Sequence, residues 1–537
     1  MTHFSANTVI DLPSSGKLSR GEPLSSHDSQ LLRYAPCSRC LYELSQTRPT
    51  GNSSSSTPVH LLDDDSLLII LSFCRPVILD ESAVSGYDAD YQVLDKGNWN
   101  RERWWYGLIQ VCRRWRYLVL DSAFHLQVSL VCARGTPVAD MLAHSPPLPL
   151  IIDHIDGEYD LLSPEDEEGI IFALQHRDRV RRIRIRKSVS ISQRLVIALD
   201  GEFPVLEYLS IDDRLFIRPL VSYITNLNVP ETFRAPHIRE LLLDNFATPI
   251  ESPQLTTMGN LVTLWLTSIP SSAYFFPNVL LQRLSLMPQL ETLGIAFNCY
   301  HPSRERQLLR TPIMTQVTLP NLHWLFFVGT ATYLEMLLPW VTIPLLKRLY
   351  VDFFNRMIYS IPQLRRFMSA ARNLRLKTAT VTFDEDHLKV MVYPNKDTGL
   401  YTLEMGVGGR HLDWQVVSAA QVFHELKTVF SAVEHLSLNY GRHNISSEWN
   451  RQADRSHWGE LLGSFGKVKT LFVGDRLVKQ VSRALQPGEG ESPTELLPEL
   501  QELSYPKRGA SRASSRAFTL FIDARRKAGR PVIVNRF

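Results

Sequence analysis

The residues that could bind a metal or perform nucleophilic chemistry are scattered along this sequence. Cys37 and Cys40 have the spacing of half a zinc site, but no second cysteine pair and no paired histidine lies near them. Gly406, Gly408 and Gly409 resemble a phosphate-binding loop whose lysine and hydroxyl residue are missing, so we expect a turn there. No serine lies in a nucleophile elbow, and the 16 histidines lack metal-ligand spacing. The sequence therefore predicts neither an enzyme nor a metal or cofactor site.

The composition is that of a folded and nearly neutral protein. The 537 residues are 44% hydrophobic and 21% charged, which is enough apolar surface to offset the entropy of folding. The 58 basic and 55 acidic residues leave a formal charge of +3, so nothing predicts attraction to nucleic acid or to a membrane surface. The first twenty residues lack a secretory signal, and no run approaches the ~18 apolar residues of a membrane span. Four of the six cysteines lie singly in apolar context, which indicates reduced thiols in a cytoplasmic or nuclear protein.

Changes in composition divide the chain into four parts. Residues 1–57 are rich in Ser, Thr and Gly, and so polar a segment buries too little to fold alone, so we expect a disordered arm. We expect residues 58–130 to form a helical domain. An insertion at 76–103, which is acidic at its start and polar at its end, interrupts this domain. We interpret 131–175 as a connecting segment and 176–537 as a repeat region with a C-terminal cap.

Two apolar segments predict helices in the second part. Three aspartates at 63–65 precede Leu67, and acidic residues favour the positive end of a helix. The apolar residues of 67–73 cover more than one face of that helix, which therefore needs burial from two sides. Apolar residues of 104–119 recur at steps of three and four, which places them along one helical stripe. Core helices of an ordinary α domain would show the same two patterns.

A short motif recurs from about residue 176: apolar, two variable residues, apolar, one variable residue, apolar. Its copies begin at Val180, Leu206, Ile238, Leu261, Leu290, Leu322 and Leu346 and, after a gap, at Val433, Val468 and Leu500. The alternation at the end of each copy suits a half-buried strand, and apolar helical stretches separate many copies. One strand and one helix cannot bury their own apolar faces, so such units stack into a curved sheet. The predicted fold class is α/β, an N-terminal helical module followed by an irregular leucine-rich-repeat-like solenoid.

The repeat is loose. Successive copies from Leu206 to Leu346 are separated by 32, 23, 29, 32 and 24 residues. Regular leucine-rich repeats run ~20–29 residues and carry an Asn or Cys after the strand, a place where only Asn298 is found. The expected elements of the less regular parts are a degenerate copy at 376–383, a hairpin at 387–406, and a closing helix and strand at 517–524 and 531–534.

The two helical segments resemble an F-box. The family pattern is a Leu-Pro opening, a leucine-rich first helix and a closing Val-Cys-Arg-Arg-Trp-Arg, and residues 111–116 match that closing hexapeptide fully. Residues 62–74 resemble the opening and the first helix, although Asp63 stands where the family has Pro and the insertion 76–103 separates the helices. The segment that follows, to about residue 155, looks like the connection found in fungal F-box proteins with long repeat regions.

This resemblance implies partners and a role. The partners are a Skp-type adaptor and a cullin scaffold, and the role is to bring a protein target to a ubiquitin-conjugating enzyme. Carried over by position, the residues that would share helix contacts between adaptor and core are Leu62, Leu67, Leu68, Ile70, Leu71, Val111, Cys112 and Trp115. The alternative is a scaffold of the same build that acts outside a ubiquitin ligase.

The variable positions of the repeat strands carry two sets of candidate target-binding residues. Large aromatic side chains are expected to project away from the core, where a target would bind them or neighbouring loops would cover them. They are Tyr208, Trp265, Trp324, Phe326, Tyr350 and Phe472. A basic set on one strand would receive an acidic or phosphorylated segment, or would simply be solvated, and consists of Arg182, Arg184 and Arg186.

Overall fold

A computed structural model of the chain describes most of residues 62–537. The described residues are 62–75, 103–155, 163–186, 193–212, 228–247, 250–252, 257–298, 307, 312–354, 360–371, 373–374, 376–384, 387–395, 401–409, 411–441, 455–486, 495–506 and 512–537. The expected arm at 1–57, with its Cys37 and Cys40, lies outside them, as does the insertion 76–103 apart from Arg103.

Sixteen strands form one sheet, in which every pairing is parallel except the two made by β13. Across the sheet the strands are β1 (Leu130–Ala133), β2 (Leu150–Ile155), β3 (Val180–Arg186), β4 (Tyr208–Asp212), β5 (Glu240–Asp244), β6 (Thr263–Ile269), β7 (Thr292–Phe297), β9 (Trp324–Gly329), β11 (Arg348–Phe353), β14 (Leu403–Gly408), β13 (His387–Tyr393), β12 (Thr378–Phe383), β15 (His435–Tyr440), β16 (Thr470–Val473), β17 (Glu502–Tyr505) and β18 (Ile533–Arg536). A separate pair joins β8 (Val317–Thr318) to β10 (Val341–Thr342). The order follows the chain except at β12 to β14, so neighbouring strands come from neighbouring stretches of sequence.

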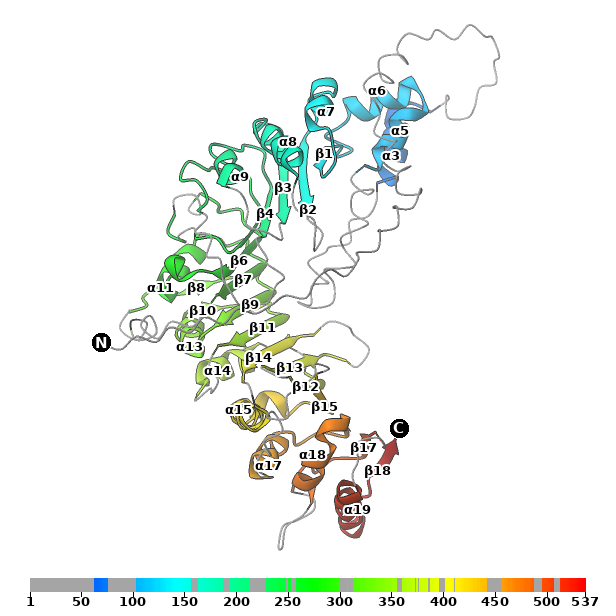
Figure 1. The fold of residues 1–537 in the computed structure, drawn as a ribbon, viewed down its shortest axis with the longest axis vertical. Helices are drawn as coiled ribbons and strands as arrows, with labels where there is room; N and C mark the ends of the chain where they lie inside the picture. Colours follow the sequence, from blue (N-terminus) through cyan, green and yellow to red (C-terminus); the bar gives the residue numbers. More distant parts are fainter. Residues whose placement is uncertain are drawn as a thin grey trace, which may run out of the picture.

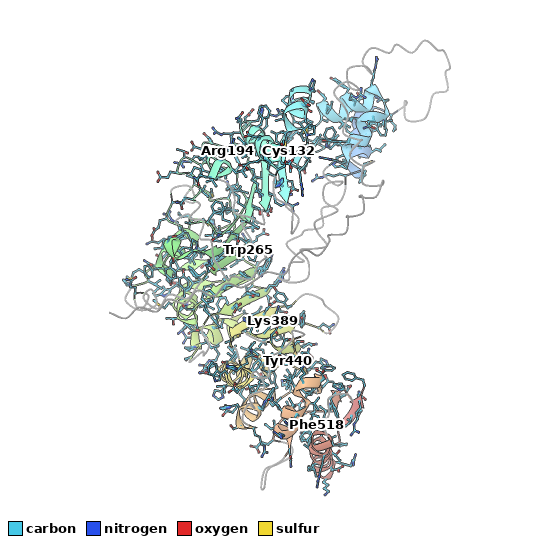
Figure 2. All side chains as sticks on the ribbon, viewed as in Figure 1. Cys132, Arg194, Trp265, Lys389, Tyr440 and Phe518 are labelled. Carbon is cyan, nitrogen blue, oxygen red and sulfur yellow. The ribbon has the colours of Figure 1, made fainter. Side chains whose placement is uncertain are left out.

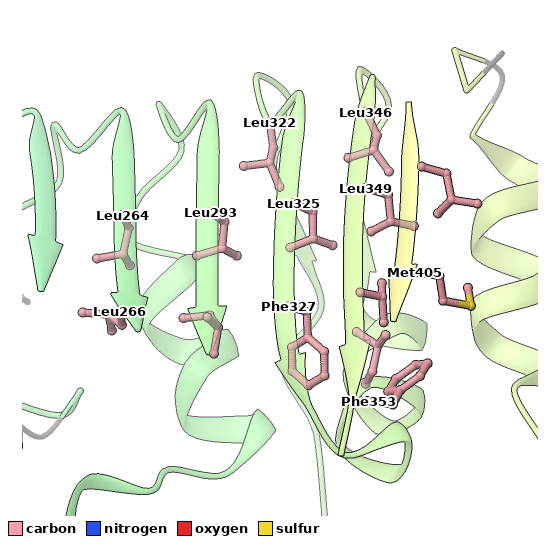
Figure 3. Packing of buried hydrophobic residues seen from close by; sticks show 14 of the residues in the cluster. Leu264, Leu266, Leu293, Leu322, Leu325, Phe327, Leu346, Leu349, Phe353 and Met405 are labelled. Atoms are coloured by element: carbon pink, nitrogen blue, oxygen red, sulfur yellow. The ribbon is translucent and has the colours of Figure 1, made fainter. Parts of the chain in front are cut away.

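The repeat predicted from the sequence is confirmed, and equivalent residues of its copies pair across this sheet. The middle apolar residues of six consecutive copies lie opposite one another on neighbouring strands, and they are Leu209, Leu241, Leu264, Leu293, Leu325 and Leu349. All six are at most 4% exposed, and Figure 3 shows this row together with the row of the next apolar position. Burial of one such side chain contributes roughly 1.5–3 kcal/mol. A shift of one residue would turn the variable residues into the core, so the apolar rows hold the register.

The helices line one side of the curved sheet, and the strands line the other (Figure 1). They are α7 (Val138–His144), α8 (Pro164–Leu174), α9 (Gln193–Ala198), α11 (Pro277–Leu284), α13 (Ala331–Leu337), α14 (Pro362–Ala370), α15 (Leu412–Glu425), α16 (Lys427–Phe430), α17 (Arg455–Gly463), α18 (Val478–Leu485) and α19 (Arg512–Lys527), with 3-10 turns η4 (Ser271–Ala273), η5 (Leu338–Trp340) and η7 (Asp475–Leu477). Parallel strands need crossover connections, and a helix on one face is the usual crossover. Because α7, β2 and α8 belong to this arrangement, the stack begins within the segment 131–175 that the sequence assigned to a connection.

The least regular part of the sequence contains the only antiparallel strand of the large sheet. The predicted hairpin at 387–406 is confirmed as β13 and β14, and the degenerate copy at 376–383 is confirmed as β12. The expected turn at Gly406, Gly408 and Gly409 is wrong for its first two residues, because both lie within β14. Gly406 lies in β14 at a place where the side chains of His387 and Asp352 occupy the space that a Cβ would need.

Within the described residues, the helices that precede the sheet are α3 (Asp64–Phe73), α5 (Trp105–Val111) and α6 (Arg113–Asp121). The single stripe predicted for 104–119 is broken at Cys112, whose backbone is extended (φ −160°, ψ 172°) and which caps α6. The Trp105 indole is 3% exposed and donates a hydrogen bond to the Ser129 carbonyl at 3.2 Å. This bond ties the helices to the residue that precedes β1, so they are anchored to the first edge of the sheet.

The C-terminal end is closed by α19 and β18, as the sequence predicted. The Arg525 side chain extends from α19 and donates to the carbonyls of Leu497, Pro498 and Leu500, each at 3.2 Å. None of the helices in the described part of the chain has the length and apolar character needed to cross a bilayer.

Candidate functional site

Helix α3 divides its apolar residues between two opposite faces. Leu67 and Leu71 are at most 1% exposed and belong to the core. Ile69, Ile70 and Phe73 are 56%, 44% and 82% exposed. Residues three and four positions apart share a helix face, so these three form an apolar strip, here called the α3 ridge, that faces solvent. The predicted adaptor-binding residues that are half-buried are Leu62, Leu68, Cys112 and Trp115.

The junction of α5 and α6 adds further exposed apolar surface. Val111 ends α5 and is 59% exposed. The Cys112 sulfur accepts a hydrogen bond from the Trp115 N–H at 3.5 Å and so begins α6, with the tryptophan half-buried against the core. Tyr117 and Phe124 are 66% and 93% exposed, and sequence reasoning missed both. Their only signal was a position off the apolar stripe, which ordinarily belongs to polar residues.

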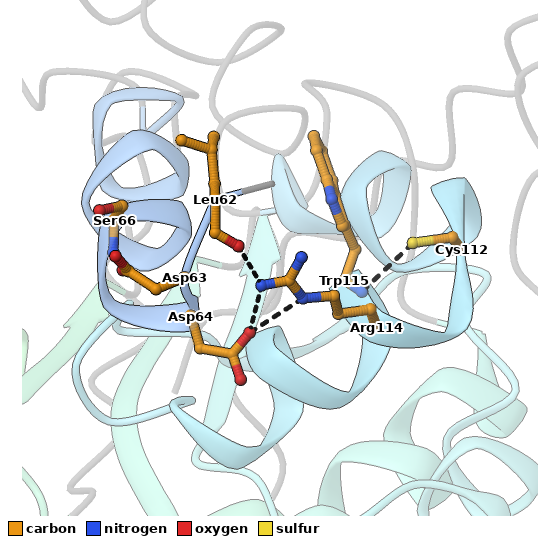
Figure 4. A network of polar contacts seen from close by, with 7 residues as sticks. All are labelled: Leu62, Asp63, Asp64, Ser66, Cys112, Arg114 and Trp115. Atoms are coloured by element: carbon orange, nitrogen blue, oxygen red, sulfur yellow. Dashed lines mark hydrogen bonds and ion pairs between the residues drawn. The ribbon is translucent and has the colours of Figure 1, made fainter. Parts of the chain in front are cut away.

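A polar network joins the start of α3 to α6 (Figure 4). The Arg114 guanidinium donates to one Asp64 carboxylate oxygen at 2.7 and 2.9 Å and also to the Leu62 carbonyl. Asp63 caps the helix by accepting a hydrogen bond from the Ser66 N–H at 2.7 Å, and this bond is the main cause that lowers the pKa of Asp63. Asp63 therefore supplies α3 with its N-cap.

The aromatic residues of the central strands lie on the helix-free face, but they cover one another. Trp324, Phe326 and Tyr350 are 4%, 1% and 9% exposed, so of the two alternatives these three agree with coverage by other parts of the chain. The half-buried Trp265 ring lies 4.9 Å from Trp324 and 4.8 Å from Phe326, and Phe326 stacks on Tyr350 at 4.3 Å between centroids. Tyr401, from the irregular segment 352–430, completes the cluster. Flat rings at the spacing of adjacent strands stack readily, which removes them from water.

The remaining predicted target-binding residues also have partners within the chain. Phe472 stacks on Phe537 at 5.5 Å between ring centroids. The Arg182 guanidinium lies 4.3 Å from the centre of the Tyr208 ring. Arg184 forms a two-pronged pair with both carboxylate oxygens of Asp153 at 2.8 Å, and the side chain of Arg186 lies outside the described residues. A phosphate would have to displace Asp153 from Arg184, so Arg184 is not available for an acidic or phosphorylated segment in this structure.

A hollow of about 360 Å³ opens beside the aromatic cluster on the same face. It lies toward the carboxyl ends of β6, β7, β9 and β11 and against the hairpin strands β13 and β14. Its apolar wall consists of Ala296, Val328 and Tyr350, which belong to the aromatic cluster. Its polar wall contains Asp352, His387, Lys389 and Glu404. Figure 2 labels Trp265 and Lys389 in this central part of the sheet.

The charges of the hollow are unevenly compensated. Lys389 Nζ lies 2.7 Å from Glu404 Oε1, and the glutamate side chain is only 3% exposed. Asp352 Oδ1 lies 3.6 Å from His387 Nε2, which is an ion-pair distance only when the imidazole is protonated. Loss of water around Asp352 raises its pKa, although His387, Lys389 and the Phe353 N–H oppose that rise. Burial therefore disfavours the charged form of Asp352.

Gly406 makes the polar wall possible. A Cβ at this position would come within 2.5 Å of His387 Nε2 and 2.7 Å of Asp352 Oδ1. Any side chain there would therefore separate the imidazole from the carboxylate. Sequence reasoning missed the hollow, and the signal that could have found it was a glycine inside a strand pattern, which often marks a close approach to a strand.

The comparisons with known proteins add no relative to this description. No protein-family model matches the chain, and no curated protein matches it. The function is therefore inferred from the residues and the geometry described above.

Proposed function

We propose that this protein is the substrate receptor of a ubiquitin ligase of the Skp, cullin and F-box type. In this proposal α3, α5 and α6 form the F-box that docks on the adaptor. The stacked strands and helices form a leucine-rich-repeat-like solenoid, and its helix-free face captures a protein target. Ubiquitin transfer belongs to partner subunits.

The observation that carries the proposal is where exposed apolar side chains gather. Among the described residues, six of the sixteen exposed large hydrophobic side chains lie between positions 69 and 124: Ile69, Ile70, Phe73, Val111, Tyr117 and Phe124. Such a concentration on three short helices and the turn after α6 supports a protein–protein contact there, because water-facing apolar surface is costly unless a partner covers it. The match of residues 111–116 to the closing F-box hexapeptide supports a Skp-type adaptor as that partner.

The proposal is tested with charges placed on the exposed face alone. Ile70→Glu and Val111→Glu would each put a carboxylate into a contact that needs apolar surface, while leaving the core untouched. We expect each to reduce recovery of the adaptor at least tenfold when the full-length protein is purified from cells. The matched control is Ile197→Glu on α9, which is 60% exposed and far from these helices along the chain.

Three outcomes separate the possibilities. Recovery of adaptor and cullin together, lost in the two variants and kept in the control, supports a ligase receptor. Recovery of the adaptor without cullin would favour the scaffold that acts outside a ligase. Unchanged adaptor recovery in both variants, or none with the natural sequence, would refute docking through these helices. Leu67→Glu is unsuitable for this test, because that residue is 1% exposed and a charge there would unfold the module.

A further inference from the structure

We infer that the hollow on the helix-free face is a binding site for a basic side chain, lysine or arginine, presented by an extended protein segment. This inference deepens the proposed function, on which it rests for the assumption that the segment belongs to the target. Its geometry is independent of α3, α5 and α6, which lie at one end of the molecule, whereas the hollow is in the central part of the sheet (Figure 1).

The shape of the hollow suits an apolar stem with a polar head. About 360 Å³ is too small for a folded element and large enough for one long side chain with part of its backbone. Ala296, Val328 and Tyr350 offer aromatic and aliphatic surface. The methylene groups of lysine or arginine pack well against such surface, while the charged head reaches a polar group beyond it.

The charge of the hollow selects a cation. The polar wall holds two carboxylates, Asp352 and Glu404, and one ammonium group, Lys389, while the His387 ring adds a positive charge only when it is protonated. Lys389 Nζ lies 2.7 Å from Glu404 Oε1, whereas the group at 3.6 Å from the Asp352 carboxylate is the His387 ring. Whenever that ring carries no proton, the wall has one more negative charge than positive charge, and Asp352 is the carboxylate without an ammonium group at 2.7 Å. A guanidinium or ammonium group beside Asp352 would supply the compensation that desolvation withholds, and an anion would be repelled.

Two backbone features indicate that the hollow is built into the fold. Gly406 removes the Cβ that would otherwise stand 2.5 Å from the His387 ring. Ser268, on the rim, has φ of 48°, a left-handed conformation that is unfavourable for any residue other than glycine, at an irregularity in the pairing of β6 with β7. The Ser268 hydroxyl donates to Asp244 at 2.9 Å, which holds this conformation. Strained backbone retained beside a hollow is common at binding sites.

The test uses blocked single residues as probes. We would titrate the full-length protein with Nα-acetyl-arginine amide and Nα-acetyl-lysine amide by isothermal calorimetry at low salt. Nα-acetyl-citrulline amide is the neutral probe of nearly the same shape, and Nα-acetyl-glutamate amide is the anionic one. We expect a dissociation constant on the order of 1 mM for at least one basic probe, as suits a ligand of this size. The two other probes should bind at least tenfold more weakly.

Two variants locate the binding. Asp352→Asn keeps the shape of the side chain and removes the charge, and we expect it to weaken binding of the basic probe about tenfold or more. Val328→Phe narrows the hollow from its apolar wall without changing charge, so it carries the test if Asp352→Asn fails to fold. The control is Asp178→Asn, an exposed carboxylate just before β3 that should change nothing.

Several results would overturn the inference. They are no heat of binding with either basic probe at tens of millimolar, equal binding of citrulline, or unchanged affinity in both hollow variants. Adaptor recovery distinguishes this failure from failure of the proposed function. Asp352→Asn should recover the adaptor normally, while Ile70→Glu should bind the basic probe normally.

Discussion

Replacing Gly294 by alanine should destabilise this protein, and the reason is a single tryptophan on the neighbouring strand. A Cβ at position 294 would lie 2.3 Å from one atom of the Trp265 ring and 2.5 Å from another. Real carbon contacts are more than 1 Å longer, so the indole would have to leave its place. Its displacement would open the ring contacts at 4.9 Å to Trp324 and 4.8 Å to Phe326.

The magnitude follows from those contacts. An aromatic pair contributes about 0.5–1.5 kcal/mol, and overpacking of a filled site costs about 1–3 kcal/mol. We therefore expect Gly294→Ala to lower the free energy of unfolding by about 2 kcal/mol. In a Trp265→Ala background the clash disappears, and alanine is favoured over glycine in a strand by about 0.5 kcal/mol. The same substitution should then be neutral or stabilising.

Urea unfolding of the four proteins in this double-mutant cycle, followed by circular dichroism, would measure the coupling. The expected coupling energy is about 2 kcal/mol in the direction that makes the double variant more stable than the sum of the single changes. An equal cost of Gly294→Ala in both backgrounds would refute the reasoning, because the tryptophan would not be the cause. A cost near zero in the natural background would refute it as well.

Two further predictions concern burial elsewhere in the fold. Arg525 is 0% exposed and donates three hydrogen bonds of 3.2 Å to backbone carbonyls of residues 497–500, so Arg525→Met should cost about 3 kcal/mol of unfolding free energy, about 1 kcal/mol for each carbonyl left without its partner. Arg526→Met, on the same helix with a side chain 67% exposed, is the control and should change thermal stability little. Burial raises the pKa of the Cys132 thiol to about 12, so iodoacetamide at pH 8 should leave it unmodified in the native protein while the exposed Cys74 is alkylated, as peptide mass spectrometry would show. Alkylation of both thiols at similar rates under native conditions would contradict that burial.

Much of the fold could be predicted because its periodicities are local. The alternation of apolar and variable residues around Leu209, Leu241 and the corresponding leucines identifies the strands. Each strand has one set of apolar residues that faces the core, so only one register of strand pairing buries all of these sets. The helix at 64–73 could also be predicted, since aspartates mark its beginning and leucines form its inner face. The break between α5 and α6 at Cys112 could not be predicted, because the apolar stripe of the sequence continues across it. The cap that begins α6 arises from one hydrogen bond to the Cys112 sulfur.

The candidate site was predicted less well. Ile70 and Val111 are exposed as an adaptor surface requires, whereas Leu67 and Leu71 lie inside, a division that depends on which side of α3 meets the core. For the aromatic set the sequence left open whether a target or the chain itself would cover the rings, and the structure shows contacts between rings of different strands that local pattern does not encode.

The sequence by itself determined which residues are apolar, at what spacing, and therefore the strands, the core rows and the apolar helices, because hydrophobic burial follows local pattern. Only the tertiary structure decided which polar groups meet. Asp352, His387 and Glu404 share a hollow because β11, β14 and β13 lie side by side in this order, with β13 reversed, and because Gly406 on β14 leaves room for the side chains of the strands on either side. A contact between side chains on separate strands depends on strand order and direction, which no local pattern encodes.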